Sequence, residues 1–371
     1  ETAIALVEAS GGLRSPRFRI LKDVVSSQVK IHQPFGGVVP SLAKREHIRN
    51  LPLVLEKLVN FSSSKIKNKK SKLQLKTQKF LKNIDLIAVT VGPGLEPALW
   101  TGINFAKDLA KRYKKPLLGV NHLEGHMYSF LLPQKTVISN FSARGGSAFG
   151  GQFSIFKVYP AIVLIVSGGH TILIHQKNLT TWKKIGETRD DAAGEAFDKV
   201  ARMLSLPYPG GALIEKLALG VPKGWQDTIE FPRPMIHQKN YDFSFSGLKT
   251  AVLYYLKGKK EARKQNVAAS FQQAIIDVLA AKTIRAAREY SAKGGSASGG
   301  KVKSIILAGG VASNNALRKR LQSESRKNQL NFLAAEKKYQ TDNAAMIAAA
   351  AYISYLKGKR RRLTAQANLS L

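Results

Sequence analysis

Short apolar runs rich in β-branched residues end in glycine turns in both halves of the chain. A buried strand that ends in Gly-Pro-Gly is predicted over residues 84–94 (IDLIAVTVGPG), and the periodicity of residues 101–113 predicts a helix after it. Residues 161–175 (AIVLIVSGGHTILIH) predict two strands joined by a tight turn, and residues 302–321 predict a strand, a glycine turn and a helix. We therefore expect an α/β chain with two related lobes that face a cleft.

Basic residues greatly outnumber acidic ones. The 371 residues include 59 Lys and Arg against 24 Asp and Glu, which gives a net charge of +35. Such an excess favours a polyanionic partner such as nucleic acid, because Lys and Arg neutralise phosphates; adhesion to an anionic membrane surface is the alternative. The sequence has no cysteine, which excludes disulfides and thiolate metal sites. No uncharged apolar run reaches the roughly 18 residues of a membrane span.

Several segments are expected at the surface. Lysines are dense in residues 65–82, which we interpret as a solvated helix face or loop, and a second basic cluster occupies residues 357–363. The near-repeats SARGGSAFGG (142–151) and SAKGGSASGG (291–300) are too glycine-rich to build a core, so we expect flexible insertions without a catalytic role. The sequence opens at Glu1 inside a predicted strand, so we expect the natural chain to begin earlier.

Two of the glycine turns are suited to binding phosphate. The turns SGGHT (167–171) and AGGVASN (308–314) lack Cβ atoms where a phosphate could approach the backbone amides. A hairpin or a helix-packing turn would use the same glycines, so each turn alone is weak evidence. Their joint occurrence favours a nucleotide in the cleft.

An acidic stretch stands out in so basic a chain. Asp190, Asp191, Glu195 and Asp198 fall close together, and the last three would share a helix face. Like charges so placed repel, so we expect the stretch to bind a hydroxyl donor such as ribose, or a cation. The alternative is an acidic first helical turn favoured by the helix dipole, which does not account for Asp198.

Two histidines stand four residues apart after the helix-capping residue type Asn121. On a helix His122 and His126 would point the same way and could share one metal ion. A protease of the H-E-x-x-H type is not expected, because Leu123 occupies the position of the general base and the acid comes one residue later. Asp342, before a predicted helix, would complete an open site with two imidazoles and one carboxylate; two ordinary polar histidines are the alternative.

These motifs together resemble one family, the tRNA-adenosine threonylcarbamoyltransferases of bacterial type (TsaD, formerly Gcp glycoprotease). The resemblance spans nearly the whole chain in the order of the family. It is carried by residues 32–47 (HQPFGGVVPSLAKREH), 91–110 (VGPGLEPALWTGINFAKDLA), 121–129 (NHLEGHMYS), 166–171 (VSGGHT), 190–204 (DDAAGEAFDKVARML), 243–252 (FSFSGLKTAV), 309–314 (GGVASN) and 341–348 (TDNAAMIA).

The resemblance implies a two-lobed actin-like and sugar-kinase (ASKHA) fold with a nucleotide and metal site in the interlobe cleft. It implies an N-terminal lobe of residues 1–130 and 336–371 and a C-terminal lobe of residues 155–335. His122, His126 and Asp342 would hold one divalent metal ion, iron (Fe²⁺) before zinc. Threonylcarbamoyl-AMP, or ATP in its place, would be bound by Ile165, Val166, Ser167, Gly168, Gly169, Asp198, Gly211 and Asn314.

The implied reaction transfers a threonylcarbamoyl group to the exocyclic amine of the adenosine 3′ of the anticodon, in tRNAs that read ANN codons, and releases AMP. The implied partners are tRNA, a paralogous TsaB-like subunit and a small TsaE-like ATPase, with no membrane, in the cytoplasm. An ATPase or small-molecule kinase of the same fold is the alternative, and turnover of an unrelated acceptor without tRNA binding would favour it.

Overall fold

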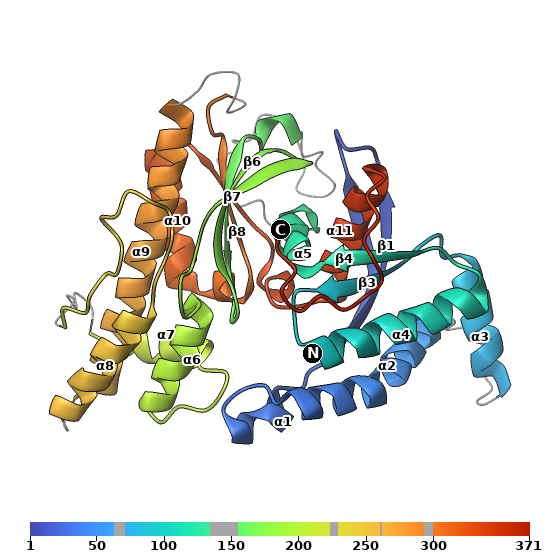
Figure 1. Cartoon of the computed structure of the whole chain (residues 1–371), viewed down its shortest axis with the longest axis horizontal. Helices are drawn as coiled ribbons and strands as arrows, with labels where there is room; N and C mark the ends of the chain where they lie inside the picture. The colour runs from blue at the N-terminus through green and yellow to red at the C-terminus, as the bar shows by residue number, and fades with distance from the viewer. Residues whose placement is uncertain (63–70, 134–154, 223–228, 260–261, 293–299) are drawn as a thin grey trace. The chain divides into compact units, whose positions relative to one another are not determined.

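In a computed structural model the chain forms an α/β structure, as the sequence predicts, with 11 α-helices and 9 β-strands among the described residues (Figure 1). The described residues are 1–62, 71–133, 155–222, 229–259, 262–292 and 300–371. The chain divides into two units: unit 1 comprises Glu1–Pro133 and Asp342–Leu371, and unit 2 comprises Gln134–Thr341. The predicted insertion at 142–151 lies outside the described residues, as do most of the insertion at 291–300 and the first part of the lysine-rich segment.

Unit 1 contains two small sheets. Strands β1 (Thr2–Ser10) and β2 (Arg17–Ser26) pair antiparallel, and β3 (Ile87–Gly92) and β4 (Leu117–Asn121) pair parallel. Parallel neighbours need a crossover connection, which α4 (Glu96–Tyr113) provides. The other helices of the unit are α1 (Val29–His32), α2 (Pro40–Ser62), α3 (Ser71–Lys82), α5 (His122–Tyr128) and α11 (Ala344–Leu356).

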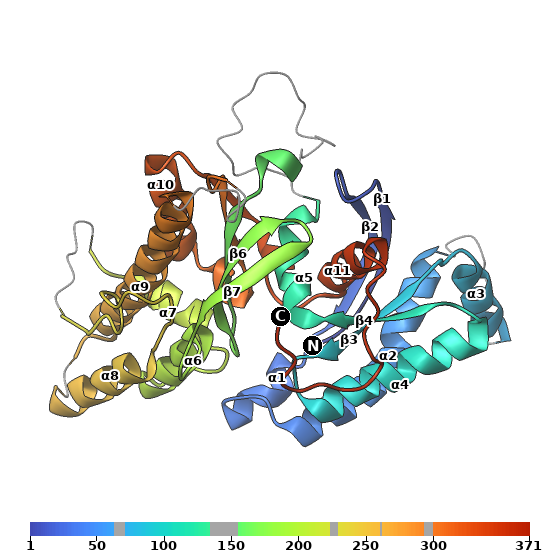
Figure 2. The same ribbon diagram turned by 45° about the horizontal axis from the view of Figure 1, so that its top comes forward.

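Helix α11 belongs to the core of unit 1, although it lies near the C-terminal end of the sequence. It packs against β1, β3, β4 and α5, and eight of its thirteen residues are buried. Figure 2 shows α5 and α11 side by side. The chain after α11 then continues along the β3 end, where Gln366 N donates to Val91 O at 2.8 Å.

Unit 2 is built on a five-stranded sheet in the order β7-β6-β5-β8-β9. Strands β5 (Ala161–Val166), β6 (Thr171–Asn178) and β7 (Thr181–Glu187) are antiparallel neighbours, whereas β8 (Ser304–Ala308) and β9 (Asn331–Ala334) continue the sheet parallel to β5. Every residue of β5 and β8 is buried, as is typical of central strands that read as unbroken apolar runs.

Helices α6 (Ala193–Met203), α7 (Gly211–Ala218), α8 (Ser246–Gly258) and α9 (Lys264–Ala292) pack on one another in unit 2, and α10 (Asn315–Lys327) packs on α9 (Figure 1). Helix α9 is long and apolar enough to cross a membrane by length and composition, but 83% of its most apolar window is buried inside the protein. Core helices of globular domains pass the same test, so α9 is weak evidence for a membrane segment.

The structure confirms the predicted local elements with two corrections. The hairpin over 161–175 and the strand, turn and helix over 302–321 are present, with a 3₁₀ turn (Gly310–Ser313) before α10. The helix predicted over 101–113 begins earlier, at Glu96, because Pro97 suits the first helical turn. Strand β3 is only partly buried before its last two residues, whereas the apolar run predicted a buried strand.

Candidate metal centre

Helix α5 begins directly at the end of β4, and Asn121 fixes its start. The Asn121 Oδ1 atom accepts hydrogen bonds from the backbone N–H groups of Leu123 (2.8 Å) and Glu124 (3.4 Å), as an N-cap does. The four-residue spacing then places His122 and His126 on the same side of the helix. The capping role predicted for Asn121 is thus confirmed.

Asp342 reaches the two histidines through the packing of α11 on α5. Asn343 caps α11 by accepting a hydrogen bond from Met346 N at 2.9 Å, which places Asp342 just before the helix. On α5, Gly125 allows the close approach: a Cβ atom at this position would lie 3.0 Å from Ile347 and 3.2 Å from Met346. The three side chains that the sequence analysis singled out therefore lie together in unit 1.

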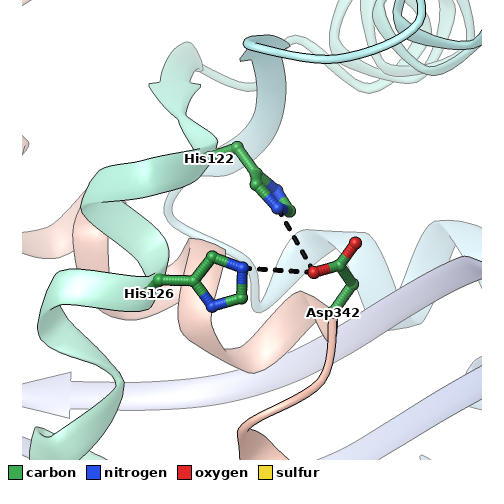
Figure 3. A group of neighbouring side chains, drawn as sticks. All are labelled: His122, His126 and Asp342. Carbon is green, nitrogen blue, oxygen red and sulfur yellow. Dashed lines mark ion pairs between the residues drawn. The ribbon is translucent and has the colours of Figure 1, made fainter. Parts of the chain in front are cut away.

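The three side chains point toward one another (Figure 3). The Asp342 Oδ1 atom lies 3.2 Å from Nε2 of His122 and 3.2 Å from Nε2 of His126. Donor atoms bound to one ion at about 2.0–2.2 Å lie roughly 3 to 3.5 Å apart in a tetrahedral arrangement. The spacing therefore fits a metal ion, and this is the only such group of His, Asp and Glu side chains among the described residues.

The three side chains affect one another's protonation: burial opposes protonation of His122, but the neighbouring Asp342 raises the pKa of this imidazole. Desolvation by the surrounding protein opposes ionisation of Asp342, but the neighbouring His122 holds the pKa of this carboxyl well below its usual value. Burial lowers the pKa of His126, whose side chain is 1% exposed, and this favours the neutral imidazole. His126 Nδ1 has no hydrogen-bond partner among the described residues, and the contact of Nε2 is the Asp342 carboxylate at 3.2 Å. A neutral buried imidazole beside a carboxylate is a donor set that a divalent ion fits.

The two glycine turns proposed to bind phosphate leave the same edge of the sheet in unit 2. Strand β5 ends at Val166 and the parallel β8 ends at Ala308, which pairs with Ile165. A Cβ atom on Gly309 would lie 2.3 Å from the Val166 carbonyl oxygen, so only glycine permits this approach. Ligands of α/β sheets bind outside the carboxyl ends of the strands, which is where both turns lie.

Helix α6 begins against the first of these turns. A Cβ atom on Gly194 would lie 2.5 Å from Ser167 O and 2.8 Å from Gly168 N, so the helix start touches the turn backbone. The positions of Gly168 and Gly169 are open, since no atom lies within 4 Å of a Cβ placed there. The turn therefore offers free space beside the start of α6, although the N–H groups of Ala193 and Gly194 already donate to Thr171 Oγ1 and Ser167 O.

Asp198 and Asn314 hold neighbouring turns of unit 2 in place. Asp198 Oδ1 accepts a hydrogen bond from Gly210 N at 2.7 Å, just before Gly211 starts α7, and burial raises the pKa of Asp198. Asn314 caps α10 and donates to Gln272 Oε1 at 2.7 Å. Asn315 N donates to Glu215 Oε1 on α7 at 2.6 Å, which links the second glycine turn to α7.

Comparison of the sequence with known proteins shows the family to which the chain belongs. The family model "TsaD: tRNA N6-adenosine threonylcarbamoyltransferase" matches residues 19–159 and 148–349. The chain belongs to the TsaD family. A protein of Thermosipho africanus named tRNA N6-adenosine threonylcarbamoyltransferase is 44% identical over 92% of this chain and 89% of its own. Relatives of the same name in Thermosipho melanesiensis and Bacillus cereus are 42% and 41% identical over the whole chain.

A solved structure is also similar. The crystal structure of T. kodakarensis HypF matches 78% of this chain and 44% of its own chain, with a TM-score of 0.51 and 15% sequence identity. At this identity the likeness supports the α/β fold and carries nothing about chemistry. The TsaD family assignment rests on the family model and the curated relatives.

The acidic stretch of this TsaD family member differs from the prediction. Helix α6 starts at Ala193, so Asp191 does not lie on a helix face with Glu195 and Asp198. Asp191 binds Lys199 and Lys249, each at 2.8 Å, and Glu195 also binds Lys199 at 2.8 Å. These acids are therefore neutralised by the chain itself.

Asp190 is likewise occupied by the protein. Its carboxylate accepts hydrogen bonds from the hydroxyls of Ser244 (2.5 Å) and Ser246 (2.6 Å) and from Phe245 N (2.8 Å). Although partial burial opposes ionisation, these bonds lower the pKa of Asp190. The carboxylate fixes the start of α8 and is not left over for a ligand.

Sequence reasoning missed one residue near the histidines. The sequence presents Glu124 only as an acid one residue out of place for a general base, yet its buried side chain binds Lys359 and Arg361 from the basic cluster after α11. The signal was present as an acid between two metal-ligand candidates and an unexplained basic run. The pairing could not be predicted because Glu124 lies more than 200 residues from Lys359 and Arg361 in the sequence.

Proposed function

We propose that the chain transfers the threonylcarbamoyl group of threonylcarbamoyl-AMP to the N6 amine of the adenosine 3′ of the anticodon in tRNAs that read ANN codons. Membership of the TsaD family carries this proposal, and the His122, His126 and Asp342 group supports it. The amine nitrogen forms a bond to the carbamoyl carbon, and the bond from that carbon to the phosphate oxygen breaks. AMP leaves with the bonding electrons, and its phosphate accepts the proton that the amine loses.

The donor is a mixed anhydride and already activated, so the chain does not need a covalent intermediate. Its residues have to orient a weak nucleophile and stabilise the charge that develops on the carbonyl oxygen and the departing phosphate. We assign donor binding to Ile165, Val166, Ser167, Gly168, Gly169, Asp198, Gly211 and Asn314 in unit 2. Support comes from the shared sheet edge of the two glycine turns and from the open space at Gly168 and Gly169.

We assign the metal to His122, His126 and Asp342, with iron as the proposed ion and zinc as the alternative. A divalent ion there would supply Lewis-acid stabilisation of negative charge, and three protein ligands leave positions open for substrate. In the chain itself, burial lowers the pKa of His126, and the packing of α11 on α5 presents Asp342 to both histidines.

The remaining assignments concern fold and partners. We propose that unit 1 and unit 2 are the two lobes of an actin-like and sugar-kinase (ASKHA) fold. We propose that the protein works in the cytoplasm with a TsaB-like paralogue and a TsaE-like ATPase. The net charge of +35 supports tRNA as the polyanionic partner, because basic side chains supply most of the sequence-independent affinity for nucleic acid. The acceptor base lies in a single-stranded loop, where it can be splayed out and reached.

Mass spectrometry of nucleosides tests the proposal. Cognate tRNA is incubated with synthetic threonylcarbamoyl-AMP and the protein, with and without the partner proteins, and threonylcarbamoyladenosine is measured. We expect product with the natural chain and a loss of at least about 100-fold with Asp342→Ala, since even residues that only support metal ligands matter 10- to 100-fold. Donor and tRNA binding without any product in the presence of both partners would contradict the proposal.

A further inference from the structure

A buried carboxylate lies on α5 between the two histidines of the metal group. Glu124 has a side chain that is 1% exposed, and its Oε1 atom accepts hydrogen bonds from Lys359 Nζ (3.1 Å) and Arg361 Nη2 (2.8 Å). Helical geometry turns this side chain away from the face that carries His122 and His126. Helix α5 is therefore contacted on one face by Asp342 and on another by the chain after α11.

The end of α11 directs the two basic side chains to this place. Gly358 has a φ of +65°, the left-handed conformation that ends helices, and its N–H donates to Tyr355 O at 2.9 Å. Lys359 N donates to Ser354 O at 2.9 Å, so the chain reverses as soon as the helix stops. Farther on, Asn121 Nδ2 donates to Ser370 O at 2.9 Å, which joins the cap of α5 to the last residues of the chain.

Alternate side chains of the basic run have different surroundings. Lys359 and Arg361 contact Glu124, and Arg361 is 16% exposed. Arg360 and Arg362, which alternate with them, are exposed. The same run thus contains two basic residues that contact Glu124 on α5 and two basic residues of equal charge that are exposed.

We propose that Glu124 is a positioning residue for the metal group, acting through a clasp with Lys359 and Arg361. The clasp joins the end of α11 to α5, while the start of α11 presents Asp342 to the same helix. A buried charge keeps its partners because the alternative is an uncompensated charge in the protein interior. The clasp therefore resists any sliding of α11 along α5, the motion that would separate Asp342 from the histidines.

The inference rests on the metal site of the proposed function, and metal binding tests it without the enzymatic reaction. The metal-free full-length protein is titrated with Co²⁺, and both the dissociation constant and the visible absorption of the bound ion are recorded. The variants are Glu124→Gln and the double variant Lys359→Met/Arg361→Met. The matched control is Arg360→Met/Arg362→Met, which removes the same charge from the same segment.

We expect the clasp variants to bind Co²⁺ about 10-fold more weakly, the effect usual for residues that support metal ligands, and the control to bind as the natural chain does. The absorption at saturating Co²⁺ should also change, because the ligand geometry relaxes. Arg361→Lys keeps the charge and should restore most of the affinity. Combining Glu124→Gln with Lys359→Met/Arg361→Met should cost no more than either alone, since all act through one interaction.

A general loss of stability would produce a different pattern. Val59→Ala removes buried methyl groups from α2, in a cluster with Leu58, Phe80 and Leu81, and should lower the melting temperature without changing Co²⁺ affinity or absorption. If Val59→Ala and Glu124→Gln weakened Co²⁺ binding equally, Glu124 would not be a positioning residue. The proposal would also be wrong if the clasp variants had the same Co²⁺ affinity and absorption as the natural chain. If the natural chain bound no Co²⁺, the metal site of the proposed function would itself be wrong.

Discussion

The metal group of unit 1 and the acidic stretch of unit 2 are both clusters of ionisable side chains, and they differ in where their partners come from. In unit 2 the chain supplies lysines, serine hydroxyls and backbone amides to Asp190 and Asp191. In unit 1 His126 is buried, its Nδ1 atom has no hydrogen-bond partner among the described residues, and its Nε2 atom contacts only the carboxylate of the same group. A polar cluster that the protein leaves unsatisfied is the better candidate for binding a ligand, however many acids the other contains.

The largest expected effect is a loss of activity when the metal group is disrupted. Asp342→Ala should abolish metal binding and reduce product formation at least about 100-fold. Because its side chain is 62% exposed, loss of its ion pairs with the histidines should cost the metal-free protein about 1 kcal/mol of unfolding free energy or less. Metal content by mass spectrometry and urea unfolding measure the two quantities. A large loss of stability would show that Asp342 is structural, like the acids of unit 2.

The opposite pattern is expected for the acidic stretch. Asp191→Ala leaves Lys199 and Lys249 without their shared carboxylate, whose side chain is 13% exposed, and should cost about 2 kcal/mol of unfolding free energy. Co²⁺ affinity should stay unchanged, because the metal group lies in the other unit. Urea unfolding with Co²⁺ titration checks both. Unaltered stability with weaker donor binding would restore the ligand role that the sequence suggested.

A smaller effect should come from a glycine within that stretch. Gly194→Ala places a methyl group 2.5 Å from Ser167 O, so the glycine turn must shift. We expect donor binding, measured with ATP by calorimetry, to weaken about 10-fold, or roughly 1.4 kcal/mol. Gly247→Ala is the control, because no atom lies within 4 Å of a Cβ there. Equal ATP affinity in both variants would argue against the turn as a donor site.

The smallest effect concerns pH. Partial burial opposes ionisation of Asp191, but its bonds to Lys199 and Lys249 lower its pKa below the ordinary 3.8. A carboxyl with a lowered folded-state pKa stabilises above its unfolded pKa and loses that contribution as the pH falls through the folded value. Asp191→Asn should therefore reduce the slope of stability against pH below about 4, by at most about 1.4 kcal/mol per pH unit. Acid unfolding followed by circular dichroism measures this; an unchanged slope would mean that the lysines do not act on Asp191.

Local patterns in the sequence were enough to predict much of the metal helix. Asn121 as a cap and the four-residue spacing of His122 and His126 involve neighbours along the chain, so helix geometry alone relates them. The hairpin of β5 and β6 was equally local, since a tight turn joins two apolar runs. The resemblance to the TsaD family, not any local pattern, predicts Asp342 as a metal ligand and assigns the donor residues.

Contacts between distant segments decided the rest. Asp342 meets the histidines because α11 packs closely over Gly125, and Glu124 is paired because Gly358 turns the chain back toward α5. The same kind of contact assigned Asp190 and Asp191 to serines and lysines, which acid density alone could not predict. Periodicity and capping report on neighbours a few residues apart, whereas the partner of a buried charge depends on which distant segment the core brings against it.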